Sequence, residues 1–153
     1  MAAQTAPADL VTCHNVLYNV PDLAPFIEAL TAHARRRVVV ELTAAHPLTT
    51  LNPLWRHFHG LPRPTGPTAG HVLAILDAMG LRAGHTKWNR PAEADYATVG
   101  ELAEVTRRRL CLPPERTAEV EAALRDTGLG GGQATDLGTA GRAVVTIWWE
   151  GSA

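Results

Sequence analysis

The stretch that decides the fold spans residues 8–23 and reads ADLVTCHNVLYNVPDL. Residues 10–13 form a short apolar run, which is typical of a buried strand. The polar tip Cys-His-Asn at 13–15 follows it, and Asp22 is placed to cap a helix over 22–34 that has one apolar face. We therefore expect a strand, a turn with polar side chains and an amphipathic helix in direct succession.

The segment after this helix predicts a parallel crossover. Residues 37–42 contain three consecutive valines without alternation, as in a strand that is covered on both faces. Strand, helix and strand in such short order form a right-handed parallel unit. Further elements are expected from periodicity and turn residues: a helix over 68–79 with Gly80 as its C-cap, a strand over 81–88, helical segments over 95–127 and a final strand over 143–149.

Composition limits the class of protein. The 153 residues are 46% apolar and 19% charged, which suits a globular chain, and we expect 1–153 to form a single domain. A net charge of -1 argues against a nucleic-acid partner. The two cysteines, Cys13 and Cys111, give neither a disulfide framework nor a metal spacing. With no basic, apolar leader and no apolar run that could span a bilayer, we expect no membrane association and a cytoplasmic protein.

Taken together, these motifs resemble the C-terminal half of a class I S-adenosylmethionine-dependent methyltransferase. Residues 8–20 are similar to the fourth-strand motif of that family, 37–42 to its fifth strand, 68–79 followed by 80–81 to its next helix, and 143–149 to its last strand. The resemblance implies an α/β protein with a partial Rossmann-like class I methyltransferase fold. Its mixed sheet would have parallel strands and a C-terminal antiparallel strand pair.

Only part of the family fold has a counterpart in this chain. Class I enzymes order their strands 3-2-1-4-5-7-6, so the chain would supply strands 4 to 7. The strands that normally hold the methionine part and the ribose of the cofactor are not matched, and we expect the other half to come from an upstream extension or another reading frame. The GLGGG string at 128–132 follows a helix pattern rather than a strand, which favours a helix stop and connection over a cofactor loop.

The candidate catalytic residues follow the first strand. In an open parallel sheet, ligands bind beyond the carboxyl ends of the strands. By resemblance, Cys13, His14 and Asn15 would contact S-adenosylmethionine, and Tyr18 would lie near the acceptor. His14 is a candidate general base; alternatively, it and Asn15 hydrogen-bond the turn and fix its shape. Glu41 ends a buried strand and is expected to pair with an arginine rather than to act in catalysis.

The long segment 43–67 is rich in proline and carries histidines and a tryptophan. Loops of this length tend to be lids or binding segments. We therefore expect an aromatic, histidine-rich substrate lid in which His46, Trp55 and His59 bind substrate. A metal site is not expected, because His57 and His59 would point to different sides of a helix and no nearby cysteine or carboxylate completes a zinc set.

These observations predict methyl transfer to an unidentified small-molecule acceptor, by a transferase that is inactive as the isolated chain. One alternative is a non-catalytic, methyltransferase-like interaction module. Strand 9–13 would then lack its usual neighbour, and its edge would pair with a second copy or a partner chain. A second alternative is a small-ligand protein that uses the histidine-rich loop and no cofactor.

Overall fold

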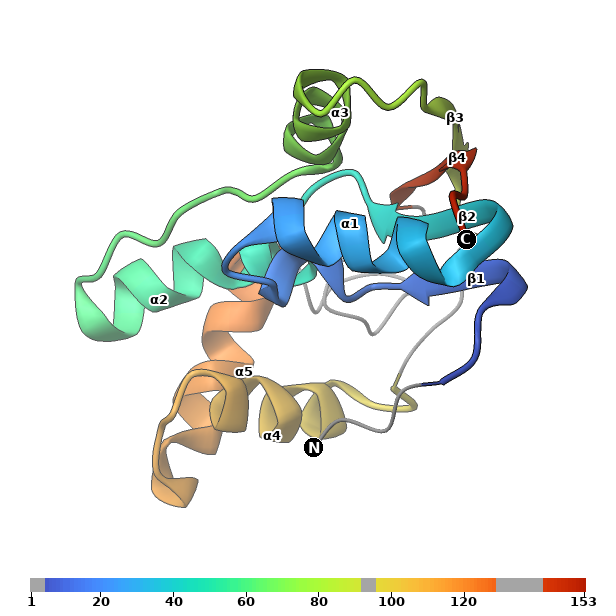
Figure 1. Cartoon of the computed structure of the whole chain (residues 1–153). Helices are drawn as coiled ribbons and strands as arrows, with labels where there is room; N and C mark the ends of the chain where they lie inside the picture. The colour runs from blue at the N-terminus through green and yellow to red at the C-terminus, as the bar shows by residue number, and fades with distance from the viewer. Residues whose placement is uncertain (1–4, 92–95, 129–141) are drawn as a thin grey trace. The chain divides into compact units, whose positions relative to one another are not determined.

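A computed structural model of the chain describes residues 5–91, 96–128 and 142–153 (Figure 1). Contacts group the chain into two compact units, of which unit 1 comprises 1–46, 66–88 and 143–153, and unit 2 comprises 47–65 and 89–142. The sequence did not indicate this division, and a single folding domain over 1–153 stays a prediction. The elements are β1 (Ala8–His14), η1 (Leu17–Asn19), α1 (Leu23–His33), β2 (Ala34–Thr43), η2 (Pro47–Leu51), α2 (Asn52–His59), α3 (Ala69–Ala78), β3 (Gly84–Asn89), α4 (Val99–Arg109), η3 (Pro114–Arg116), α5 (Thr117–Asp126) and β4 (Ala143–Glu150).

Unit 1 is built on a mixed four-stranded sheet with the order β1-β2-β4-β3. β1 and β2 are parallel, with Cys13 opposite Val40 and His14 opposite Glu41. β4 runs antiparallel to β2, and its other neighbour is β3, also antiparallel. The mixed α/β sheet expected from the sequence is therefore confirmed.

The two helices of unit 1 begin where the sequence predicted. Asp22 is the N-cap of α1 with a non-helical φ of -121°, but its side chain makes no capping hydrogen bond. Thr68 is the N-cap of α3 and forms a capping box with His71. The predicted C-cap at Gly80 was one residue late, because Met79 holds that position and Gly80 follows it with a φ of 74°.

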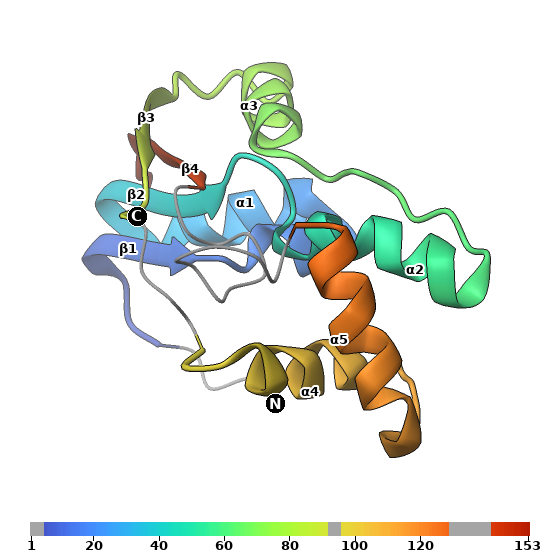
Figure 2. The same cartoon turned by 180° about the vertical axis from the view of Figure 1, so that it is seen from behind.

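One face of this sheet is covered by α1 and α3. Val38, Val40 and Leu42 are fully buried on that face and join Ile27 of α1 and Leu76 of α3 in one apolar core. In Figure 1, α1 lies in front of β1 and β2, and Figure 2 shows the same strands from behind. The sequence predicted that the valine run is covered on both faces, but only Val38 and Val40 face this core, and Val39 lies half-buried on the other face.

The opposite face of the sheet, which we call the open face, is less buried. Since strand residues alternate between faces, Leu10 and Val39 lie here, and Leu10 is 52% exposed. Trp148 lies on this face against Gly84, where an added Cβ would come within 2.5 Å of the indole. Trp149 points the other way, is buried, and donates from Nε1 to Thr31 Oγ1 over 2.8 Å.

Unit 2 is helical in its described residues. Its apolar core joins η2 and α2 to α4 and α5, with Leu54, Leu102 and Leu124 fully buried. Arg107 of α4 fixes the segment after this helix, because it donates to Leu112 O over 2.6 Å and to Glu104 of the same helix over 3.1 Å. The lid-like segment of the sequence thus packs with the later helical segment in one unit.

Candidate functional site

The carboxyl end of β1 presents Cys13, His14 and Asn15 in three different ways. Cys13 is buried in the core, and burial raises the pKa of its thiol. His14 points to the open face, with 53% of its side chain exposed. Asn15 adopts a left-handed φ of 55°, and its amide donates to Glu41 O over 2.8 Å. Cys13 is therefore placed as a core residue, while His14 and Asn15 are accessible at the strand end.

His14 lies beside Glu41, its register partner on β2. Nδ1 of His14 is 3.7 Å from Oε1 of Glu41, which is an ion-pair distance rather than a hydrogen bond. The prediction that Glu41 pairs with an arginine was wrong, because its ion-pair neighbour in the structure is the imidazole of His14. The pair thus places an imidazole beside a carboxylate at the carboxyl ends of the two parallel strands.

Polar side chains continue from the His14–Glu41 pair across the open face to β4 and β3. Glu41 is opposite Thr146 on β4, and Thr146 Oγ1 accepts a hydrogen bond from Trp88 Nε1 over 3.1 Å. Trp88 is 40% exposed. The sheet register therefore places an imidazole, a carboxylate, a hydroxyl and an indole side by side on a solvent-accessible surface.

Hydrogen bonds between Tyr18 and Thr43 hold the segment after β1 against the end of β2. The amide of Thr43 donates to the Tyr18 hydroxyl, and Thr43 Oγ1 donates to Ala45 O over 2.5 Å. The Tyr18 hydroxyl must then donate its own proton to Thr43 Oγ1, which lies 2.6 Å away. Its ring also meets that of His46 edge-on, with centroids 5.2 Å apart. The hydroxyl of Tyr18, which the resemblance placed near the acceptor, is thus engaged within the fold.

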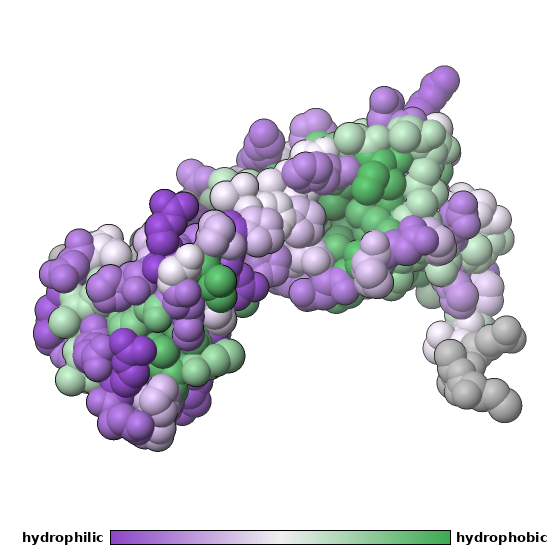
Figure 3. All heavy atoms as spheres, turned by 90° about the vertical axis from the view of Figure 1, so that its left-hand side faces the viewer, coloured by the Kyte–Doolittle hydropathy of each residue, from purple (hydrophilic) through white to green (hydrophobic). Residues whose placement is uncertain are grey.

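A pocket of about 540 Å³ opens beside Tyr18, and all of its lining residues belong to unit 1. Apolar side chains of η1, α1, β2 and α3 form most of its wall, and Asp22, Thr68 and His71 are the polar residues in it besides Tyr18. Figure 3 faces the end of unit 1 at which α1 begins, and shows apolar residues in green gathered there. We call this cavity the α1–α3 pocket.

The α1–α3 pocket and the His14–Glu41 pair lie on opposite faces of the sheet. Leu42 lines the pocket from the covered face, whereas His14 and Glu41 alternate with the buried residues Cys13 and Leu42 and so face the other way. The sequence predicted that His14 and Tyr18 both follow the carboxyl end of the first strand, where the structure has them, but it could not assign them to faces of the sheet.

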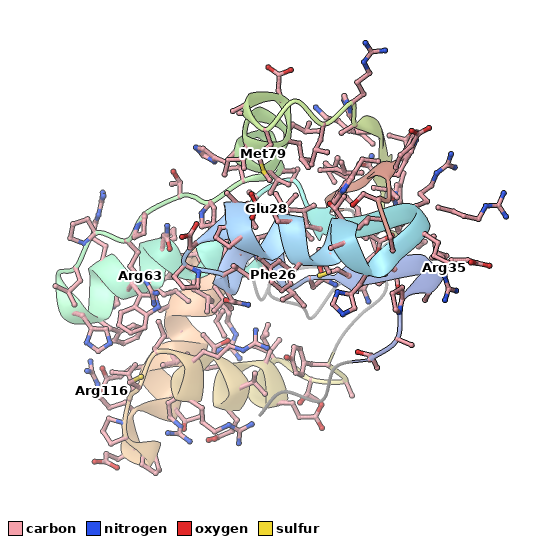
Figure 4. The ribbon with its side chains drawn as sticks, in the orientation of Figure 1. Phe26, Glu28, Arg35, Arg63, Met79 and Arg116 are labelled. Carbon is pink, nitrogen blue, oxygen red and sulfur yellow. The ribbon has the colours of Figure 1, made fainter. Side chains whose placement is uncertain are left out.

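The other two predicted substrate residues, Trp55 and His59, belong to unit 2. The ring centroids of Trp55 and His59 are 4.7 Å apart, and the Arg63 guanidinium lies 4.6 Å from the Trp55 centroid. Arg63 is labelled beside α2 in Figure 4. His59 Nε2 donates to Leu110 O over 2.8 Å. These contacts make His59 a connection between α2 and the end of α4, while Tyr18 and His46 form a separate contact in unit 1.

Other sequence features are resolved only in part. Gly128 follows α5 with a φ of 74°, as a helix stop requires, while 129–132 of the GLGGG string lie outside the described residues. Among residues 5–91, 96–128 and 142–153, no group of three or more His, Cys, Asp or Glu side chains is arranged to hold a metal ion. In the same ranges, no helix combines the length and apolar character needed to cross a bilayer.

Sequence reasoning missed the polar residues of the α1–α3 pocket. Asp22 was read as a helix cap and His71 was not singled out, although Thr68 and His71 have the spacing of a capping box. Comparison of the sequence with protein-family models and with characterised proteins gave no match. The site is therefore argued from its geometry.

Proposed function

We propose that this chain forms the C-terminal part of a class I methyltransferase-like fold and contributes to S-adenosylmethionine-dependent methyl transfer to a small molecule. The observation that carries the proposal is the strand order β1-β2-β4-β3. It equals the order 4-5-7-6 that the resemblance implies, with the parallel pair and the antiparallel strand at the corresponding positions. Strand order is a stronger support than any single motif, since it depends on long-range pairing.

The residues of this chain would act as follows. His14 Nε2 would accept the proton that the acceptor hydroxyl or amine loses when it is methylated. Glu41, 3.7 Å from Nδ1, stabilises the imidazolium that results. When bound, the cofactor supplies a methyl group that is already activated by a sulfonium, so positioning contributes much of the rate. The exposed side chains of His14 and Asn15 suit part of a cofactor pocket, and the described residues supply no Gly-rich loop after a strand for the rest.

Two surfaces support the proposal that further strands and helices complete the sheet. In the described sheet β1 has β2 as its neighbour, so its other edge offers unpaired backbone groups. The open face carries Leu10, which is 52% exposed and lies opposite Arg37, whereas parallel sheets are usually covered on both faces. A second half that adds a strand to β1 and a helix over Leu10 would satisfy both surfaces.

Titration of the ¹⁵N-labelled chain with S-adenosylmethionine, followed by NMR, tests this function. With half of the pocket supplied elsewhere, we expect weak binding, with a dissociation constant on the order of 1 mM, that shifts the amides of Cys13, His14 and Asn15. His14→Gln is the test variant for this contact. His33→Gln, which changes an exposed histidine at the end of α1, is its control. Binding at micromolar concentration would disprove the need for a second half. If the cofactor shifts only amides outside 13–15, or shifts none, the proposed contact between the cofactor and these three residues is wrong.

A non-catalytic interaction module is the second candidate, and the open edge of β1 is the observation that favours it. A module of this kind would use β1 and the exposed Leu10 to hold another chain, with no role for His14. Size-exclusion chromatography with light scattering, at concentrations up to about 1 mM, tests self-association. A monomer at all concentrations counts against pairing of two copies, and a dimer abolished by Leu10→Lys supports it.

A further inference from the structure

The α1–α3 pocket has the size and lining of a small-molecule site. Its volume of about 540 Å³ lies within the range of ligand pockets. It is also located just beyond the carboxyl ends of the parallel strands β1 and β2, where open α/β sheets bind ligands. Nine of its thirteen lining residues are apolar, and they come from η1, α1, β2, α3 and the segments that precede α1 and α3.

The charge in this pocket comes from Asp22, its one acidic lining residue. The Asp22 side chain makes no capping bond to α1, and no hydrogen bond or ion pair joins it to the other described residues. A negative charge at a helix N-terminus interacts favourably with the helix dipole. The pocket therefore offers a free negative charge next to apolar walls.

His71 supplies a second directed group. Its Nδ1 accepts a hydrogen bond from the Thr68 amide over 3.0 Å, which puts the ring proton on Nε2 in the neutral imidazole. In that tautomer Nε2–H is the hydrogen-bond donor of the ring. Thr68 and His71 also engage the first amides of α3, which leaves fewer free donors there for an anion.

We propose that the α1–α3 pocket binds a small amine with an apolar, ring-sized body, whose ammonium group pairs with Asp22. The apolar walls take the body, and His71 Nε2 donates to a hydroxyl or carbonyl oxygen where the ligand has one. The proposal does not depend on methyl transfer, because His14 and Glu41 lie on the opposite face of the sheet. Its failure would leave the proposed function untouched.

Three probes with the same body separate charge from shape. 2-Phenylethylamine, 2-phenylethanol and phenylacetate differ in carrying a cation, a neutral group and an anion. Titration of the ¹⁵N-labelled chain at pH 7 should give the tightest binding for the amine, with shifts at Leu23, Ala24 and Val72. Equal binding of all three would show a merely apolar cavity, and tighter binding of phenylacetate or no binding at all would overturn the proposal.

Asp22→Asn tests the charge in the protein. Asparagine is as good an N-cap as aspartate, so the variant should fold, which circular dichroism verifies. We expect amine binding to weaken about tenfold or more while binding of 2-phenylethanol stays unchanged. Asp77→Asn on α3 is the matched control, because Asp77 is an exposed carboxylate that does not line the pocket. If Asp22→Asn leaves amine binding unchanged, the assignment of Asp22 is refuted.

Discussion

Removal of the Tyr18 hydroxyl should destabilise unit 1 more than an exposed tyrosine-to-phenylalanine change would. In Tyr18→Phe, the Thr43 amide loses its acceptor and Thr43 Oγ1 loses its donor. An unsatisfied, partly buried amide costs about 1–3 kcal/mol, whereas the ring and its packing remain. We therefore expect the free energy of unfolding to fall by about 1–3 kcal/mol in urea titrations with an unchanged m value.

A double-mutant cycle with Thr43→Val isolates this connection. Valine suits a strand but cannot accept from the Tyr18 hydroxyl. Because both residues belong to one hydrogen-bond network, the two changes together should cost less than their sum, by about 0.5–3 kcal/mol. A Tyr18→Phe variant as stable as the parent, or strictly additive effects, would refute the proton arrangement assigned to this network.

Three further outcomes follow from the structure. Gly84→Ala should displace the Trp148 indole, whose atoms lie 2.5–2.7 Å from the added Cβ, and change the near-ultraviolet circular dichroism. The pKa of Glu104 is lowered, first by the hydrogen bond from Thr117, so the ionised carboxylate stabilises the folded protein above the ordinary glutamate pKa. This stabilisation is lost as the pH falls through the folded-state pKa. Glu104→Gln should therefore destabilise the protein at pH 7 but not at low pH, which thermal melts across this pH range will test. The buried Cys13 thiol, whose pKa burial raises, should react with a disulfide reagent far more slowly in the folded than in the urea-unfolded protein.

The sequence predicted the first half of unit 1 well because its signals are local. An apolar run, a capping residue and a valine run define β1, α1 and β2 without knowledge of any partner. The strand bounds were too short by up to three residues, since exposed residues such as Arg35 and Arg36 extend β2 without an apolar signal. Backbone pairing, rather than burial, decides these positions.

The candidate site was less predictable because it depends on pairing across the chain. The approach of His14 to Glu41 follows from the parallel register of β1 and β2, which no local pattern reports. The polar lining of the α1–α3 pocket likewise depends on a bridge between Ala45 and Thr68 that brings α3 to the end of β2. The division into two units rests on contacts between segments separated by a whole strand and helix.

The position of β4 in the sheet also determines when the strands can pair during synthesis of the chain. β4 lies between β2 and β3, yet it is the last of the described strands to be synthesised. While a ribosome is still making 143–150, β1, α1 and β2 can assemble, but Val38 has not yet met Trp149 and β3 has no strand beside it. Pairing so distant along the chain is slow to form, so nascent chains should keep apolar strands uncovered for longer and need protection from aggregation.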